Sequence, residues 1–187
     1  MKEPFFSIII PCLNSSATIN RALDSVLNQS FKDFEVLIMD GVSQDNTVMK
    51  VKEYEDNRLK VFIEKDLGIY DAMNKGLYKS TGIWLYFLGS DDELIDPYVL
   101  SDIHEYILKC KCEVLYGNVK VYGDTPWAKD GTVYSGKFDF YKFFKSNICH
   151  QSIFYKRDFI NKNQLLFDLK FPLSSDWDFN FRCWNKT

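Results

Sequence analysis

Short apolar runs rich in β-branched and aromatic residues alternate with stretches of helical periodicity through the first 110 residues of this 187-residue chain. The apolar runs are 5–10, 34–39, 59–63 and 83–88, and apolar residues spaced three and four apart follow each of them. Such alternation predicts a parallel sheet with right-handed crossovers and helices on both faces. We therefore expect an α/β fold whose first strand ends at Pro11, because proline cannot donate to a β-ladder.

The pattern changes after residue 113. A strand over 114–122 is interrupted by glycine, 132–134 is its expected hairpin partner, and 138–144 fits a short helix. Residues 148–155 predict one more strand with a polar middle, before a final helix with acids in its first turn. Since the sequence stops inside that helix, we expect 1–187 to be a single domain that continues beyond Thr187; a frayed terminus is the alternative.

Charge and cysteine usage argue against several classes of protein. The net charge of −3 and the pI near 5.4 give no support to a nucleic-acid partner. The sequence lacks a secretory signal and a run of 18 apolar residues, so a reducing cytoplasm is the expected compartment. The five cysteines contain no C-x-x-C pair, which predicts neither a zinc site nor a disulfide framework, and Cys110 and Cys112 are expected to be packing thiols.

Acidic residues follow three of the expected strands: Asp40 after the second, a Glu/Asp segment after the third, and Asp91 with Asp92 after the fourth. A parallel sheet brings these ends to one edge, where ligands bind in open α/β sheets. Each acid taken singly fits a helix cap, but two adjacent carboxylates repel each other unless a cation or hydrogen-bond donors offset the charge. Together with Asp45 and Asp176, the acids indicate a pocket for a nucleotide diphosphate and a divalent metal ion. Glycine-rich P-loop and dinucleotide turns are absent after the first strand.

Ordered motifs extend this reading over nearly the whole chain. They are Ser7-Ile8-Ile9-Ile10-Pro11 with Asn14, Asp40-Gly41-x-Ser43-x-Asp45-x-Thr47, Gly68 through Asn74-Lys75-Gly76, Ser90-Asp91-Asp92, His150-Gln151-Ser152 and Asp176-Trp177-Asp178. Together they resemble the motifs of family-two glycosyltransferases with the GT-A fold. The segment 69–76 with the later His-Gln-Ser is similar to bacterial enzymes that build surface polysaccharide repeat units. The resemblance implies a GT-A-like domain with a mostly parallel central sheet, and inverting transfer of a hexose or related sugar.

The resemblance also implies a role for each residue of the site. Asp92 is implied as the ligand of a divalent metal ion, Mn²⁺ or Mg²⁺, that carries the leaving diphosphate, with Asp91 nearer the ribose and sugar. Asp176 is implied as the general base for the acceptor hydroxyl, and Trp177 or Asp178 as part of the acceptor side. The residues implied to line the nucleoside cleft or to contact the donor are Pro11, Asn14, Asp40, Asp45, Asp66 and Asn74.

The sequence departs from the family pattern in several places. Gly41 stands where a second acid often follows the first, and Leu13 where an aromatic residue is usual, so the nucleobase stays open. Ser175 replaces the glutamate that commonly precedes the base. His150 is open between a third metal ligand, an acceptor contact and a hydrogen-bonded structural residue. Asn74 is open between a donor contact and a helix cap.

The expected substrates are a nucleotide-diphosphate sugar donor and a glycan or lipid-linked glycan acceptor, in bacterial polysaccharide biosynthesis. A lipid-linked acceptor would bring this cytoplasmic protein to the inner membrane face as a peripheral protein. Two alternatives stay open. A nucleotidylyltransferase would normally carry a glycine-rich basic loop after the first strand, which the segment 11–14 is not. A nucleotide-sugar or glycan-binding module without catalysis is the second, and the presence of Asp176 argues against it.

Overall fold

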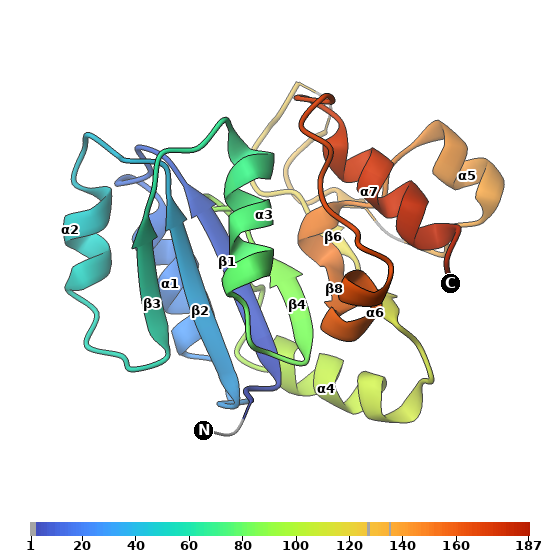
Figure 1. Ribbon diagram of the computed structural model, residues 1–187, viewed down its shortest axis with the longest axis horizontal. Helices are drawn as coiled ribbons and strands as arrows, with labels where there is room; N and C mark the ends of the chain where they lie inside the picture. The colour runs from blue at the N-terminus through green and yellow to red at the C-terminus, as the bar shows by residue number, and fades with distance from the viewer. Residues whose placement is uncertain (1–2, 127, 135) are drawn as a thin grey trace.

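The computed structural model describes residues 3–126, 128–134 and 136–187. The strands of its central sheet are β1 (Phe6–Cys12), β2 (Phe34–Asp40), β3 (Leu59–Ile63), β4 (Trp84–Phe87), β5 (Val114–Tyr116) and β8 (Ile153–Lys156). Their order is β3-β2-β1-β4-β8-β5, in which β1 to β4 run parallel and β8 runs antiparallel to both of its neighbours (Figure 1). The predicted α/β fold with a mostly parallel sheet is confirmed.

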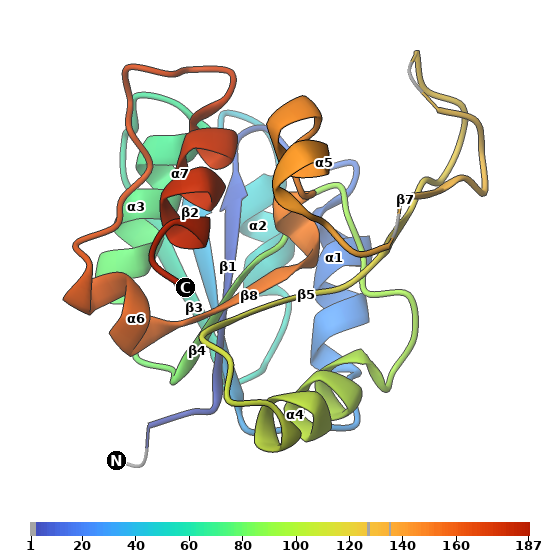
Figure 2. The same ribbon diagram turned by 90° about the vertical axis from the view of Figure 1, so that its right-hand side faces the viewer.

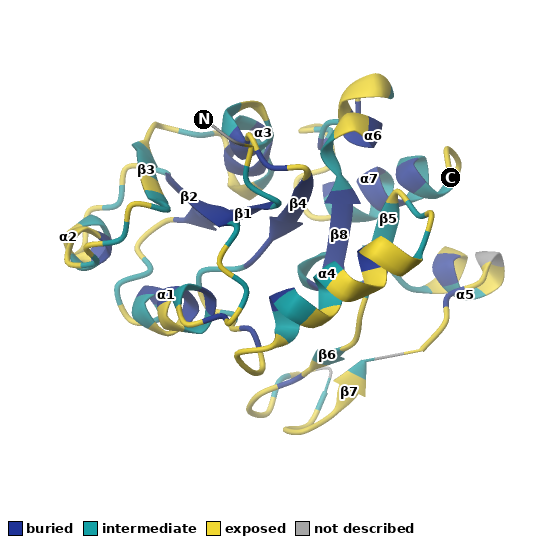
Figure 3. Ribbon diagram, turned by 90° about the horizontal axis from the view of Figure 1, so that it is seen from below, coloured by how far each residue is buried: buried dark blue, intermediate teal, exposed yellow. Residues whose placement is uncertain are grey.

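Helices cover both faces of this sheet, as predicted. They are α1 (Ile19–Leu27), α2 (Thr47–Lys52), α3 (Ile69–Lys79), α4 (Val99–Lys109), α5 (Phe140–Lys145), α6 (Arg157–Lys162) and α7 (Ser175–Trp184). Helices α1, α2 and α4 share a hydrophobic cluster with Ile8 and Ile10, whereas α3, α5, α6 and α7 share one with Ile9. Successive side chains of a strand point to opposite faces, and here helices cover both faces. All residues of β1 and β2 are therefore buried (Figure 3).

The first strand continues through Pro11, so the prediction that it ends there is wrong. Pro11 pairs in register with β2, and the strand ends at Cys12. The Cys12 carbonyl accepts a hydrogen bond from the Gly41 amide on the β2 side, so Pro11, one residue earlier, faces the β4 side. The pairing of β1 with β4 ends at Ile9. Pro11 therefore has no partner on β4 to which a backbone N–H would donate, and the missing N–H costs no hydrogen bond.

The chain after residue 113 folds as short pieces. Strands β6 (Val119–Lys120) and β7 (Val133–Tyr134) form the predicted hairpin, which projects from the body of the molecule (Figure 2). The strand predicted over 148–155 is instead the 3₁₀ helix η1 (His150–Ser152) followed by β8. The amide and hydroxyl of Ser152 both donate to the Cys149 carbonyl, and these two bonds close a turn where the pattern predicted extended chain.

Cys110 and Cys112 form a disulfide between α4 and β5, so the expectation of two packing thiols is wrong. Their Cα atoms lie 5.3 Å apart, a separation at which cysteines can be bridged. Two residues of extended strand would span about 6.6 Å. The chain is therefore compressed between the two cysteines, a local conformation that their spacing in the sequence does not report.

Candidate active site

The loops that follow β1 and β2 are tied together through Asn14. Its backbone N–H donates to Ser43 Oγ (2.8 Å), and its Oδ1 accepts from the Gln44 amide (2.8 Å). Asn14 has φ 52°, a left-handed conformation that asparagine adopts more readily than most residues. Asn14 therefore holds the shape of the loops at the carboxyl edge of the sheet.

Asp45 joins the same two loops. Its carboxylate accepts from the hydroxyl and the amide of Thr47, the latter at 2.9 Å, and from the Ser16 amide at 3.0 Å. The hydrogen bonds from Thr47 and Ser16 lower the pKa of Asp45, because they favour its ionised form. These contacts secure the start of α2, so the carboxylate of Asp45 holds the loops after β1 and β2 together.

Asp40 and Asp66 bring two more carboxylates to the ends of β2 and β3. Asp40 is buried and accepts from the amide (2.9 Å) and the hydroxyl (2.5 Å) of Ser43. Asp66 accepts from the Gly68 amide (2.9 Å) through Oδ1. Its Oδ2 lies 2.5 Å from the point where a Cβ atom at Gly41 would stand. Any side chain at position 41 would therefore require the Asp66 carboxylate to move.

Cys12 marks the point where these acids come together. Burial raises the pKa of its thiol, and the negative charges of Asp40, Asp45 and Asp66 raise it further. The structure thus gathers three of the predicted acids around the end of β1, next to Pro11. They form one side of the candidate site.

The loop after β4 carries Asp91 and Asp92. It is joined to the loop after β1 by the hydroxyls of Ser90 and Ser15, which lie 2.8 Å apart. Burial, and then the charge of Asp91, raises the pKa of Asp92, although the neighbouring His150 acts against this rise. Among the described residues, nothing donates a hydrogen bond to the buried Oδ2 of Asp92. A carboxylate oxygen of this kind suits a hard divalent cation.

Asp176 lies in the first turn of α7, and side chains from two other segments hold it. Its Oδ1 accepts from the Tyr70 hydroxyl (2.8 Å), and its Oδ2 accepts from Asn147 Nδ2 (2.7 Å). His150 Nδ1 lies 3.3 Å from the same Oδ2. Burial would raise the pKa of Asp176, but hydrogen bonds from His150 and Tyr70 outweigh burial and lower it. The side chain keeps an exposed fraction of 17%, so the ionised carboxylate is accessible to a proton donor.

His150 lies between Asp176 and Asp92. Burial, together with the charges of these two carboxylates, raises the pKa of the adjacent Cys149 to about 11, so both carboxylates lie near one turn of chain. A histidine that ligates a metal usually gives its second nitrogen to a carboxylate, and Nδ1 of His150 faces Asp176 in this way. Within the described ranges, no group of three or more His, Cys, Asp and Glu side chains is arranged to hold a metal ion.

The polar groups of Asn74 and Trp177 are used in packing. Asn74 is buried, and its amide donates to the Phe167 carbonyl and accepts from the Phe167 N–H, both at 2.9 Å. The Trp177 indole N–H donates to the Phe143 carbonyl (3.2 Å). Asn74 lies inside α3 and is therefore not a helix cap, and its amide bonds to the chain before α7.

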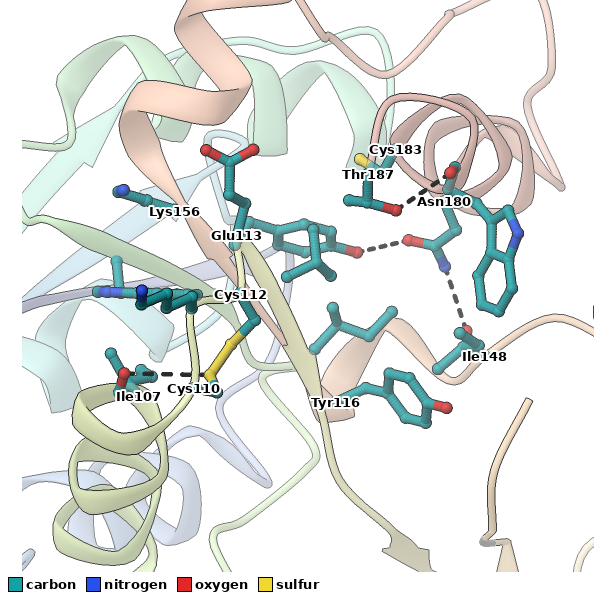
Figure 4. Close-up of a pocket in the computed structure, with 16 residues that line it drawn as sticks. Ile107, Cys110, Cys112, Glu113, Tyr116, Ile148, Lys156, Asn180, Cys183 and Thr187 are labelled. Atoms are coloured by element: carbon teal, nitrogen blue, oxygen red, sulfur yellow. Dashed lines mark hydrogen bonds between the residues drawn. A yellow bond between two sulfur atoms is a disulfide. The ribbon is translucent and has the colours of Figure 1, made fainter. Parts of the chain in front are cut away.

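A cavity of about 680 Å³ lies apart from these acids, between α4, β5, β8 and α7 (Figure 4). The Cys110–Cys112 disulfide, Lys156 and Asn180 are part of its wall. None of the acids predicted for the site lines it, because it borders β5 at the edge of the sheet. We therefore locate the candidate active site at the carboxyl ends of β1 to β4.

Sequence reasoning missed Tyr70 and Asn147. Tyr70 lies inside the motif 69–76, but an aromatic residue in an amphipathic helix is more often part of the core. Asn147 follows α5 without any pattern of its own. Their contacts with Asp176 join residues 106 and 29 positions apart, so no local signal reports either contact.

Sequence comparison connects the chain with known transferases. The family described as Glycosyl transferase family 2 matches residues 7–163. A PGL/p-HBAD biosynthesis glycosyltransferase of Mycobacterium bovis is 39% identical over 189 residues, which cover 99% of this chain and 72% of the relative. The Escherichia coli UDP-Glc:alpha-D-GlcNAc-diphosphoundecaprenol beta-1,3-glucosyltransferase WfgD is 35% identical over 122 residues, which cover 65% of this chain and 48% of the relative.

Solved structures share the fold. Staphylococcus aureus TarS 1–349 in complex with UDP-GlcNAc matches with a TM-score of 0.77 and 25% identity, covering 97% of this chain and 54% of that chain. The mannosyltransferase PcManGT from Pyrobaculum calidifontis, in complex with GDP-Man and Mn²⁺, matches with a TM-score of 0.68 and 19% identity, over 90% and 48%. The chain thus spans about half the length of these structures. The family match and the mycobacterial relative show that this chain, with its GT-A-like α/β fold, belongs to glycosyl transferase family 2.

Proposed function

We propose that this chain is the catalytic domain of an inverting glycosyltransferase that moves a sugar from a nucleotide-diphosphate donor to a hydroxyl of a glycan or lipid-linked glycan. The acceptor oxygen forms a bond to the anomeric carbon while the bond from that carbon to the diphosphate oxygen breaks. The hydroxyl proton passes to Asp176, and the nucleoside diphosphate leaves with the bonding electron pair. Attack opposite the leaving group inverts the anomeric configuration.

The observation that carries this proposal is that Asp92 and Asp176, both near the turn at Cys149 and His150, have different surroundings that shift their pKa values in opposite directions. Asp92 has a raised pKa and a buried oxygen without a donor, whereas hydrogen bonds keep Asp176 ionised. Environments that move the pKa values of two acids apart suit them to different tasks. Asp92 is suited to a cation on the leaving group, and Asp176 to the proton of the nucleophile.

A divalent metal ion, Mn²⁺ or Mg²⁺, fits the groups at the end of β4. The described side chains form no ready group of three metal ligands, so Asp92 would hold the ion through the Oδ2 that lacks a donor, with Asp91 beside it. Such an ion offsets the negative charge that develops on the leaving diphosphate. The other steps of the proposed reaction belong to residues of this chain, which orient the donor and accept the proton of the acceptor hydroxyl.

The loops after β1, β2 and β3 supply the nucleoside side of the proposed site. Asp66 offers a hydrogen-bond acceptor there, whereas Asn14 and the buried Asp40 hold the shape of the loops next to Pro11. The neighbour TarS is described with UDP-GlcNAc, which supports a uridine diphosphate sugar as the donor class. We extend that donor class to this chain.

A lipid-linked acceptor is the more specific part of the proposal. The relative WfgD is named for an acceptor that carries diphosphoundecaprenol, which supports such an acceptor here. The protein would then work from the cytoplasm as a peripheral protein at the inner membrane face. In the described part of the chain, no helix is long and apolar enough to cross a bilayer. Failure to cosediment with vesicles of anionic phospholipid would contradict the peripheral location.

Release of nucleoside diphosphate tests the reaction, with UDP-glucose and UDP-N-acetylglucosamine as donors, Mn²⁺ as the metal and water as the acceptor. Asp176→Asn should lower release by at least about 100-fold, because the amide keeps the shape of the side chain but cannot accept the proton. The thermal shift caused by UDP with Mn²⁺ should stay at the wild-type value. Asp158→Asn is the matched control, an acid in the first turn of α6, and should change neither quantity.

Two results would overturn the proposal. Equal release by Asp176→Asn and by the control would remove Asp176 as the base. A wild-type protein that binds these donors but releases no diphosphate would instead support a nucleotide-sugar-binding module.

A further inference from the structure

We propose that Tyr70 and Asn147 are positioning residues that fix the orientation of the Asp176 carboxylate, and that buried Asn180 and Tyr155 hold Asn147 in turn. This inference rests on the proposed function, because it gives those residues a role only if Asp176 accepts the acceptor proton. It adds a supporting structure that neither the sequence motifs nor the comparisons assign.

Tyr70 holds one carboxylate oxygen from the first turn of α3. Its hydroxyl donates to Asp176 Oδ1 at 2.8 Å. Its ring stacks on the buried Phe167, with ring centroids 5.5 Å apart and planes inclined by 20°. The backbone of Phe167 is in turn bonded on both sides to the Asn74 amide. Packing against Phe167 therefore holds the Tyr70 ring in place independently of Asp176, so the position of its hydroxyl donor is fixed.

Asn147 holds the other oxygen through a chain of hydrogen bonds that begins in the core. Tyr155 donates to Asn180 Oδ1 (2.5 Å), and Asn180 Nδ2 donates to Asn147 Oδ1 (3.0 Å) and to the Ile148 carbonyl (3.2 Å). Asn147 Nδ2 then donates to Asp176 Oδ2 (2.7 Å). Figure 4 shows Asn180 at the wall of the cavity between α4 and α7, bonded to Ile148.

The direction of these bonds matters for a base. Tyr70 and Asn147 each donate through an uncharged group, so they favour the ionised carboxylate without competing for the acceptor proton. A carboxylate has about four lone-pair positions, and Asn147 with His150 use those of Oδ2, so the bond from Tyr70 leaves a position open on Oδ1. Ser175, the residue before Asp176, does not share this work, because its buried hydroxyl has no hydrogen-bond partner in the described structure. Tyr70 and Asn147 therefore orient the carboxylate from opposite sides, and His150 Nδ1 lies beside them, 3.3 Å from Oδ2.

The test measures kcat and KM for diphosphate release from UDP-glucose and UDP-N-acetylglucosamine with Mn²⁺. Tyr70→Phe and Asn147→Ala should each lower kcat by about 10- to 100-fold, because a displaced base meets the hydroxyl in a poorer geometry. The KM for the donor should not change. Tyr54→Phe is the matched control: it removes a tyrosine–aspartate bond of 2.9 Å, to Asp24 on α1, and should keep the wild-type kcat.

A double variant separates positioning from general damage to the fold. In the Asp176→Asn background, adding Tyr70→Phe should cause no further loss of rate, because the group that Tyr70 orients has already gone. The positioning role alone would be overturned if the losses of rate in the double variant multiplied. It would also be overturned if Tyr70→Phe kept the wild-type kcat while Asp176→Asn was inactive. A wild-type protein that releases no diphosphate would overturn the proposed function and this role with it.

Discussion

Substitution of the buried Glu35, near the amino-terminal end of β2, tests which contacts stabilise the sheet that carries the site. Three donors converge on its Oε1: the Ser7 hydroxyl (2.6 Å), the Thr81 amide (2.7 Å) and the Thr81 hydroxyl (2.9 Å). Lys60 donates to its Oε2 (2.6 Å). The carboxylate therefore ties β1, β2 and β3 to the chain that enters β4.

The size of the effect follows from which donors are left without an acceptor. In Glu35→Ala the buried Ser7 hydroxyl loses its acceptor, whereas the exposed Thr81 and Lys60, whose exposed fraction is 46%, can turn to water. Breaking a buried pair costs about 3–5 kcal/mol, and the exposure of Lys60 points to the low end, about 3 kcal/mol. Glu35→Gln keeps an acceptor at Oε1 and loses only the charged bond to Lys60, so we expect about 1.5 kcal/mol.

The pH dependence of the free energy of unfolding also reports how much the Glu35 carboxylate stabilises the fold. Burial would raise the pKa of Glu35, but hydrogen bonds from Lys60, Ser7 and Thr81 outweigh burial and lower it. A lowered pKa means that the ionised group stabilises the fold fully above its unfolded pKa of about 4.3. That contribution is lost as the pH falls through the lower folded pKa. The difference in stability between wild type and Glu35→Gln should therefore be constant above pH 4.3 and shrink below it.

Urea unfolding followed by circular dichroism measures these free energies of unfolding, with an unchanged m-value as the condition for comparing variants. Glu105→Gln is the control, because it breaks an exposed ion pair with Lys109 on α4, and no change in midpoint should be resolved. A loss for Glu35→Ala no larger than that for Glu35→Gln would refute the reasoning, since it would mean that the donors on Oε1 find other acceptors.

Two further predictions concern the site and the packing around it. Asp92→Asn should raise the melting temperature of the metal-free protein, because it removes a buried charge beside Asp91, and should abolish the thermal shift caused by UDP with Mn²⁺; an unchanged shift would count against the metal role. Gly76→Ala should destabilise the protein by about 1–3 kcal/mol in urea unfolding, because the new Cβ would stand 2.4 Å from Ile9 Cγ2, whereas Gly117→Ala, with its nearest neighbour at 4.0 Å, should cost much less.

Much of the core could be predicted because its signals are local. The apolar runs and helical spacing of the first 110 residues predicted β1 to β4 and the helices between them, since both periodicities are set by neighbours within one or two turns. The gathering of Asp40, Asp45 and Asp66 around Cys12 follows from the same pattern. Parallel strands bring their carboxyl ends to one edge, whatever their other partners are.

The local rules failed where a residue's partner lies on a distant segment. Pro11 continues its strand because pairing with β4 has already ended, a fact of register rather than of proline chemistry. Asn74 is bonded to Phe167, 93 positions later, and so packs the interior of α3 rather than capping the helix. The bridge between Cys110 and Cys112 depends on how the chain bends between α4 and β5.

The order of strands and helices, the carboxylates at the strand ends and the family resemblance can all be read from the order of the residues. The surroundings of each carboxylate follow from the folded chain: the buried Oδ2 of Asp92 has no donor, and Tyr70 and Asn147 hold the carboxylate of Asp176. The physical reason is that periodicity is set between neighbours in the chain. The hydrogen-bond partners of a side chain are set instead by the packing of distant segments, such as those of Tyr70 and Asp176, 106 positions apart.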